Sequence, residues 1–142
     1  MTQKISATIE IAAAPEQVWA VLADLASYPE WNPVFREASG LLTPGNRITI
    51  KSTQPETGHT MTVKVKVLTA EPATELRWVS SVLGLMTGEH SFILSPTGGG
   101  TQLVQTQTYR GLFTRFPAKT ISRIQASFEA INQAIKQRAE NH

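Results

Sequence analysis

Apolar and polar residues alternate with a period of two over much of this 142-residue chain. This is the pattern of strands that bury one face and expose the other. The clearest case is the segment 60–68, where Met61, Val63 and Val65 alternate with threonine and lysine. Turns rich in glycine and proline separate the segments, and their short length favours antiparallel pairing. The pattern predicts strands at residues 5–11, 47–53, 60–68, 75–78, 87–95 and 101–110, and a loop over 80–86.

Two segments have helical spacing instead. Pro15 suits the first turn of a helix, and this helix should end before Pro29, which restricts the residue preceding it. The proline-bounded run 28–33, which carries Trp31, is too rich in proline for more than one helical turn and is expected to form an aromatic lid. The longest helix is predicted near the carboxyl end. Its apolar residues recur three and four apart between about residues 117 and 138, at Ile121, Ile124, Phe128, Ile131 and Ile135.

Together these elements indicate an α+β fold. An antiparallel sheet with one apolar face needs a cover, and the last helix, about 30 Å long, is the one predicted element long enough to provide it. If the sheet curves around this helix, the space between them becomes the natural site for a ligand. We expect the lid to form the rim of that cavity, with Trp31 touching whatever enters.

Composition narrows the class of protein. The length fits one domain over residues 1–142, and 13 Lys and Arg against 11 Asp and Glu give a net charge of +2. The basic residues are scattered, so no nucleic-acid partner is predicted. The absence of cysteine excludes disulfides and thiol chemistry. No signal peptide and no run long enough to span a bilayer are evident, which predicts a cytoplasmic protein without integral membrane association.

Several local motifs are distinctive. They are PEQVWAVLAD from Pro15, YPEWNP from Tyr28, LRW from Leu76, GEHSF from Gly88, GGTQL from Gly99 and GLF from Gly111, followed by the amphipathic helix. The chain resembles over its whole length the START-like, helix-grip (Bet v 1-like) superfamily, and within it the SRPBCC proteins called polyketide cyclase/dehydrase-like. The resemblance implies a curved antiparallel sheet of about seven strands wrapped around a long C-terminal helix, with two short helices after strand 1. It also implies a shared scaffold with many roles, among them lipid, hormone and ubiquinone binding, aromatase/cyclase activity and chaperone regulation.

His90 is the candidate for acid–base chemistry, because strand alternation turns it inward and an imidazole titrates near neutral pH. The alternative is a core histidine that is hydrogen-bonded to a neighbour. Glu89 projects to the opposite face of the strand, so the adjacent Glu-His-Ser residues do not form a catalytic triad. Three polar side chains of the next strand should also face inward, where each needs a hydrogen-bond partner. The partner is another of the three, a water molecule or a ligand. The three are Gln105, Gln107 and Tyr109.

Two apolar loops, around Leu85 and Phe113, are expected to fold inward and gate the pocket; exposed, they would touch membranes or promote aggregation. The resemblance to cyclases implies a cavity arginine, but Arg77 alternates with inward-facing neighbours and should face outward. No metal site and no cofactor are predicted. The residues expected to contact a ligand are Trp31, Met61, Val63, Val65, Trp78, His90, Phe92, Leu103, Gln105, Gln107, Tyr109, Phe113, Ile124, Phe128 and Ile131.

Three functional hypotheses follow from these features. The leading one is a carrier or sensor that binds a lipophilic or aromatic small molecule, such as a lipid, a polyketide or an isoprenoid-like compound, as a monomer or weak homodimer. The second is a cyclase- or dehydratase-type enzyme with His90 as general base and Tyr109 or a glutamine holding a carbonyl. The third is a protein-interaction module, which would present an exposed apolar patch instead of a closed pocket.

Overall fold

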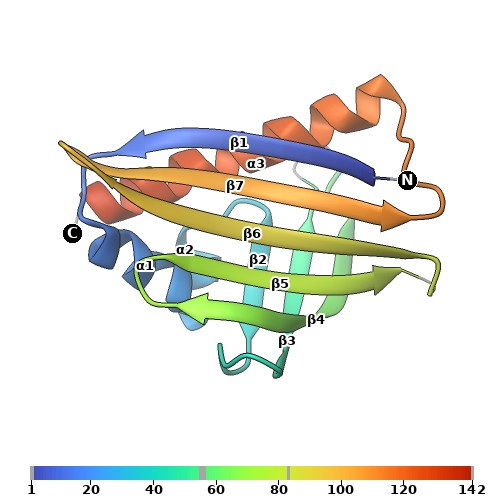
Figure 1. Ribbon diagram of the computed structural model, residues 1–142, viewed down its shortest axis with the longest axis horizontal. Coiled ribbons are helices and arrows are strands. Elements are labelled where there is room, and N and C mark those ends of the chain that lie inside the picture. Colours follow the sequence, from blue (N-terminus) through green and yellow to red (C-terminus); the bar gives the residue numbers. More distant parts are fainter. Residues whose placement is uncertain (1, 55–56, 83, 142) are drawn as a thin grey trace.

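The computed structural model of the protein describes residues 2–54, 57–82 and 84–141. Leu83 of the expected loop and the terminal His142 lie outside these residues. Figure 1 shows a curved sheet with the long helix α3 behind it and the short helices near the carboxyl end of α3. In chain order the elements are β1 (Thr2–Ile11), α1 (Pro15–Ala23), the 3-10 helix η1 (Leu25–Ser27), α2 (Tyr28–Trp31), β2 (Phe35–Ser39), β3 (Arg47–Thr53), β4 (Thr60–Glu71), β5 (Glu75–Val82), β6 (Met86–Thr97), β7 (Gly100–Gly111) and α3 (Ala118–Glu140).

The seven described strands form one antiparallel sheet in the order β1-β7-β6-β5-β4-β3-β2. Strands β2 to β7 follow one another as a meander, and β1 then pairs with β7. The hairpin of β6 and β7 forms as predicted, around a turn at Gly98 and Gly99. The predicted helix-grip fold is confirmed, including the short helices after β1.

The segment after β1 differs from its prediction. Helix α1 ends at Ala23, well before Pro29, and η1 separates it from α2. Tyr28 has helical backbone angles (φ −53°, ψ −39°), and Pro29 occupies the first turn of α2, where its missing N–H has no partner to lose. Tyr28 is 1% exposed and its hydroxyl donates a hydrogen bond to the Leu22 carbonyl oxygen (2.7 Å). It therefore belongs to the core and not to an exposed lid.

Two strands also differ from the predicted pattern. The sequence pattern does not predict strand β2, because a bulge between Phe35 and Glu37 breaks its alternation. Strand β5 continues to Val82, so the connection to β6 is much shorter than the loop expected over 80–86. The serines at 80 and 81 lack the apolar side chains from which that extension could be predicted.

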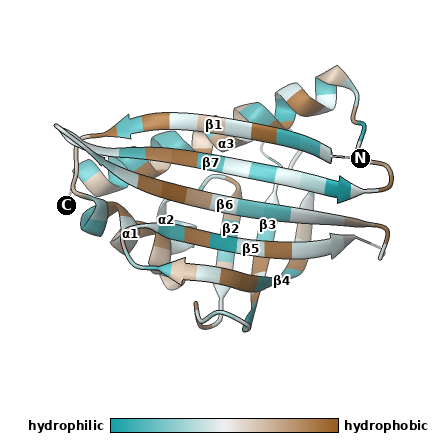
Figure 2. Ribbon diagram, in the orientation of Figure 1, coloured by the Kyte–Doolittle hydropathy of each residue, from teal (hydrophilic) through white to brown (hydrophobic). Residues whose placement is uncertain are grey.

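The core lies between the concave face of the sheet and α3. Figure 2 shows hydrophobic and hydrophilic residues alternating along the strands, and the buried hydrophobic residues of the sheet form one core cluster with those of α3. Helix α3 packs mainly against β1 and α1. Burial increases along this helix, since Ile121 and Ile124 are half-buried whereas Phe128, Ile131 and Ile135 are buried. The space between helix and sheet is thus filled at the carboxyl half of α3 and more open at its amino half. No helix in the described part of the chain is long and apolar enough to cross a membrane.

Candidate ligand pocket

His90 lies inside the grip, in a cluster of aromatic rings. Its side chain is 2% exposed and stacks on Trp78 from β5, with ring centroids 5.5 Å apart and planes 15° apart. Three phenylalanines surround the rest of the imidazole, with centroid distances of 4.9 to 5.5 Å. They are Phe92 from β6, Phe128 from α3 and Phe35 from β2. These contacts fix the orientation of the imidazole and exclude water from its faces.

Both ring nitrogens of His90 contact side-chain amides of β7. Nε2 lies 3.0 Å from Oε1 of Gln105, and Nδ1 lies 2.5 Å from Oε1 of Gln107. The amide nitrogen of Gln105 donates in turn to two acceptors on α3, the carbonyl oxygen of Phe128 (3.1 Å) and Oδ1 of Asn132 (2.7 Å). We call His90, Gln105, Gln107 and Asn132 the buried polar network. It links β6, β7 and α3 in the middle of the core.

The proton of His90 can be placed from the donors around it. Because the amide nitrogen of Gln105 is committed to α3, Gln105 offers only its oxygen to the ring, and Nε2 must carry a proton. Burial lowers the pKa of His90 from 6.5 to about 4, since the charged ring would lose its hydration, so the ring is neutral at pH 7. Nδ1 then holds a lone pair and needs a donor. Rotation of the Gln107 side-chain amide by a half-turn presents its NH2 group to Nδ1 as this donor. The opposite orientation, with the amide oxygen facing Nδ1, suits the charged ring, in which Nδ1 is also protonated.

This arrangement limits what His90 can do. A general base needs a nitrogen lone pair within reach of the substrate proton, and here both nitrogens face protein amides within the packed core. Tyr109, the second candidate catalytic residue, is half-buried and packs edge-on against Phe116 at 4.8 Å. Burial raises the pKa of its hydroxyl, so Tyr109 stays protonated at neutral pH and can act as a hydrogen-bond donor.

The predicted ligand contacts at the level of His90 are packed against one another. Six of them are buried side chains of the core: Val65, Trp78, Phe92, Leu103, Phe128 and Ile131. Towards the amino end of α3 the inner face becomes more open, because Val63, Gln107 and Tyr109 are half-buried and Met61 is 54% exposed. The concave face is therefore filled at one end and accessible at the other.

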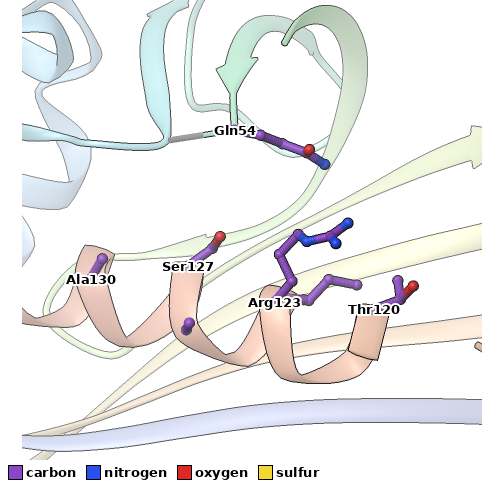
Figure 3. A pocket seen from close by; sticks show the side chains of 7 residues that line it. Gln54, Thr120, Arg123, Ser127 and Ala130 are labelled. Carbon is purple, nitrogen blue, oxygen red and sulfur yellow. The ribbon is translucent and has the colours of Figure 1, made fainter. Parts of the chain in front are cut away.

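A pocket of about 280 Å³ lies at the open end, between α3 and the turn that follows β3. Its walls combine small or aliphatic side chains with a few polar ones. Figure 3 shows Gln54 opposite the helix, with Arg123 and Ser127 pointing from α3 towards it. We call this the α3 pocket, and its lining is Gln54, Thr120, Arg123, Ile124, Ala126, Ser127 and Ala130.

The α3 pocket includes one of the predicted ligand contacts, Ile124. The structure places Trp31 elsewhere: it packs against Tyr28 and lines two shallow depressions beside Arg138, at the other end of α3. Phe113 does not fold inward as expected but is 74% exposed. Its backbone, with φ of +62°, holds the side chain away from the core.

Sequence reasoning missed most residues of the α3 pocket, and it missed Phe35 in the aromatic cluster. On α3 a signal was available. On this helix a stripe of small and polar residues, three and four apart, lies beside the apolar stripe; it consists of Thr120, Arg123, Ser127 and Ala130. Gln54 carries no comparable signal, because its position over the helix depends on the curvature of the sheet.

The charged residues of the sheet lie away from this pocket. Arg77 pairs with Glu75 (2.8 Å) and Glu89 (2.7 Å), neighbours on the face of the sheet opposite His90. These carboxylates raise the pKa of Arg77, so it remains charged there. Within the described residues, no three His, Asp or Glu side chains gather into a group that could hold a metal ion.

Comparison with known proteins places this geometry in a family. Several solved structures share the fold over nearly the whole chain. Their sequence identities to this chain are low and therefore establish the fold but no function. A START superfamily protein from Mycobacterium smegmatis has a TM-score of 0.77 and 18% identity, with 97% of each chain covered. The protein Ara h 8.0201 has a TM-score of 0.77 and 15% identity, with 100% of both chains covered. The di-domain ARO/CYC StfQ from the steffimycin biosynthetic pathway has a TM-score of 0.77 and 15% identity, over 99% of this chain and 52% of that one.

Sequence comparison is more specific. Curated protein sequences contain no significant match to this chain. The sequence model of the family described as "Polyketide cyclase / dehydrase and lipid transport", however, matches residues 2–140. This match and the START superfamily neighbour confirm the predicted resemblance. The chain belongs to the polyketide cyclase/dehydrase and lipid transport family.

Proposed function

We propose that this protein is a carrier or sensor that binds a small hydrophobic molecule with one polar end in the α3 pocket. The observation that supports this most directly is the composition of the pocket wall. Ile124, Ala126 and Ala130 provide an apolar surface, while Gln54 and Arg123 provide hydrogen-bond donors opposite each other. Pockets with mostly apolar walls and a few convergent polar groups are the usual form of small-molecule sites.

The volume of the pocket indicates the size of the ligand. Its 280 Å³ is slightly less than the roughly 300 Å³ at which small-molecule sites usually begin. A medium-length acyl chain or a single substituted aromatic ring fits this volume. A larger lipid would require α3 to move away from the turn after β3.

A binding role agrees better with the buried polar network than the cyclase-type alternative does. Of the histidines in the described chain, neither His59 nor His90 lines the α3 pocket. The ring nitrogens of His90 are engaged by Gln105 and Gln107. The polar groups that face the pocket, such as those of Thr120 and Ser127, are suited to orienting a ligand by hydrogen bonds.

The proposal is tested by filling the pocket. In Ala130→Trp an indole would occupy the space beside α3, and we expect decanoate, measured by isothermal titration calorimetry, to bind at least about tenfold more weakly than to the wild type. Gln133→Trp is the matched control, because Gln133 is exposed on the same helix outside the pocket lining. Its affinity should match that of the wild type.

Native mass spectrometry of freshly purified protein provides an independent test. We expect a bound hydrophobic molecule that is present in the wild type and in Gln133→Trp and is depleted in Ala130→Trp. Equal occupancy and equal decanoate affinity in the two tryptophan variants would refute the assignment of the pocket. A wild-type protein that binds neither decanoate nor any co-purified molecule would refute the carrier or sensor function.

A further inference from the structure

An exposed apolar tip lies at the end of the molecule near the amino end of α3. Three large hydrophobic side chains protrude there: Leu85 is 47% exposed, Leu112 is 57% exposed and Phe113 is 74% exposed. They come from two loops, one between β5 and β6 and one between β7 and α3, and Figure 1 shows both loops at the same end of the sheet. We call these three residues the apolar tip.

The geometry of the apolar tip is fixed by the backbone. The N–H of Leu112 donates to the carbonyl oxygen of Leu85 (3.0 Å), which joins the two loops. A side chain at Gly111 would collide with the same carbonyl oxygen, so the close approach of the loops requires glycine there. Phe113 has φ of +62°, a conformation that is uncommon for a bulky residue. The protruding side chains are therefore presented by a defined structure.

Three cationic residues lie close to the apolar tip in the sequence. Arg110 precedes it, Arg115 follows two positions after Phe113, and Lys119 lies in the first turn of α3; all three are exposed. Between Glu89 and Glu129 the sequence contains no acidic residue. Glu89 itself, 3.9 Å from Arg110, is already engaged by Arg77 at 2.7 Å. The tip thus combines protruding apolar groups with positive charge.

We propose that the apolar tip docks this protein on the surface of anionic lipid membranes. Phe113, Leu112 and Leu85 would enter the boundary between headgroups and acyl chains, while Arg110, Arg115 and Lys119 contact anionic headgroups. This inference goes beyond the proposed ligand binding. The two are connected by position, because Thr120 of the α3 pocket follows Lys119 directly on α3.

A bilayer suits this surface better than a protein partner. Three protruding side chains cover much less than the roughly 800 Å² per partner of a stable protein interface. A membrane needs no matching cavity, because lipid chains rearrange around each inserted side chain. The positive charge of Arg110, Arg115 and Lys119 would also disfavour a second copy of the same tip, whereas it complements phosphatidylglycerol or phosphatidylserine.

Vesicle sedimentation tests the docking directly. The wild type is mixed with large vesicles of neutral phosphatidylcholine, or of phosphatidylcholine with phosphatidylglycerol in a ratio of about 70 to 30, at low and high salt. We expect binding to the anionic vesicles, weakened at high salt and weak on neutral vesicles. Phe113→Asn should reduce binding about tenfold, and asparagine tolerates the positive φ of this position. Arg115→Gln should reduce binding to anionic vesicles about fivefold.

The control is Leu41→Asn, which removes a side chain that is 71% exposed in the loop between β2 and β3. This variant should bind anionic vesicles like the wild type. Circular dichroism and thermal unfolding verify that Phe113→Asn is folded.

Absence of wild-type binding to anionic vesicles at low salt, or equal binding by Phe113→Asn, would overturn the proposal. A concentration-dependent dimer that Phe113→Asn abolishes, without vesicle binding, would assign the tip to a second copy instead. Vesicle binding does not require a ligand, so these outcomes are independent of the α3 pocket tests.

Discussion

Acidification should destabilise this protein through His90. Burial lowers the pKa of His90 to about 4 in the folded protein, whereas the exposed ring of the unfolded chain has a pKa of 6.5. Between these two values the unfolded state binds more protons, so the free energy of unfolding falls as the pH falls from about 6.5 to about 4. At about 1.36 kcal/mol for each pKa unit, the contribution of His90 that is lost amounts to about 3 kcal/mol. The stabilising contribution of His90 is fully present above pH 6.5, and below pH 4 no more of it is lost.

Urea unfolding between pH 4 and pH 7.5, followed by tryptophan fluorescence, measures this contribution. Carboxylates titrate in the same range, so the wild type is compared at each pH with His90→Gln, which lacks the imidazole but retains an amide for hydrogen bonding. The variant loses the stacking on Trp78 and should be less stable at pH 7.5. Because it has no buried imidazole to protonate, the advantage of the wild type should decrease by about 3 kcal/mol at pH 4.

Two further measurements make the test specific. His59→Gln, which removes an exposed histidine in the turn after β3, is the control for loss of a histidine outside the core, and it should change the unfolding free energy at pH 7.5 by less than about 0.5 kcal/mol. Nuclear magnetic resonance of the imidazole should show that His90 stays neutral down to about pH 5, with Nε2 carrying the proton that Gln105 accepts. A difference between wild type and His90→Gln that does not change with pH, or a His90 resonance that titrates near 6.5, would refute the reasoning.

A turn glycine and a buried tyrosine offer further tests by urea unfolding. Gly100→Ala would push a methyl group against the Ile11 carbonyl oxygen and should cost about 3 kcal/mol or more, whereas Gly98→Ala meets no atom within 4 Å and should change stability by less than about 0.5 kcal/mol. Equal effects would contradict the turn geometry. Tyr28→Phe leaves the Leu22 carbonyl oxygen without its donor and should cost about 1 to 2 kcal/mol. Wild-type stability would show that water replaces this bond.

The fold could be predicted where one physical signal dominates a segment. Helix α3 has apolar residues at helical spacing from Ile121 to Ile135, about four turns, and β4 alternates from Met61 to Val67, so both elements are evident from the sequence. The bulge in β2 removes that signal. The prolines near Tyr28 predict an exposed lid, but the partner of its hydroxyl, the Leu22 carbonyl, becomes available only where α1 ends.

The site is harder to predict than the fold, because it depends on how much space the side chains leave between the sheet and α3. Alternation puts His90 and Gln105 on one face, and their hydrogen bond shows that they meet. Alternation does not reveal whether side chains from β6, β7 and α3 leave space between them. That depends on the sizes of residues brought together by curvature, and here Ala126 and Ala130 leave a pocket beside Gln54, whereas Phe128 fills the interior.

The attachments of α3 explain why the space lies at its amino half. Gln105 holds the helix to β7 through the Phe128 carbonyl and Asn132, and the N–H of Ala12 donates to the Glu140 carboxylate at 2.7 Å. Both attachments lie at or after Phe128, so the carboxyl half of α3 is bound to the sheet at two levels. Drawing that half away would leave the amide of Gln105 buried without its acceptors, at a cost of about 1 to 3 kcal/mol. In the amino half, by contrast, the apolar contacts are made by Ile121 and Ile124, which are only half-buried. A ligand too large for the α3 pocket would therefore displace the amino half, which is also the half beside the apolar tip.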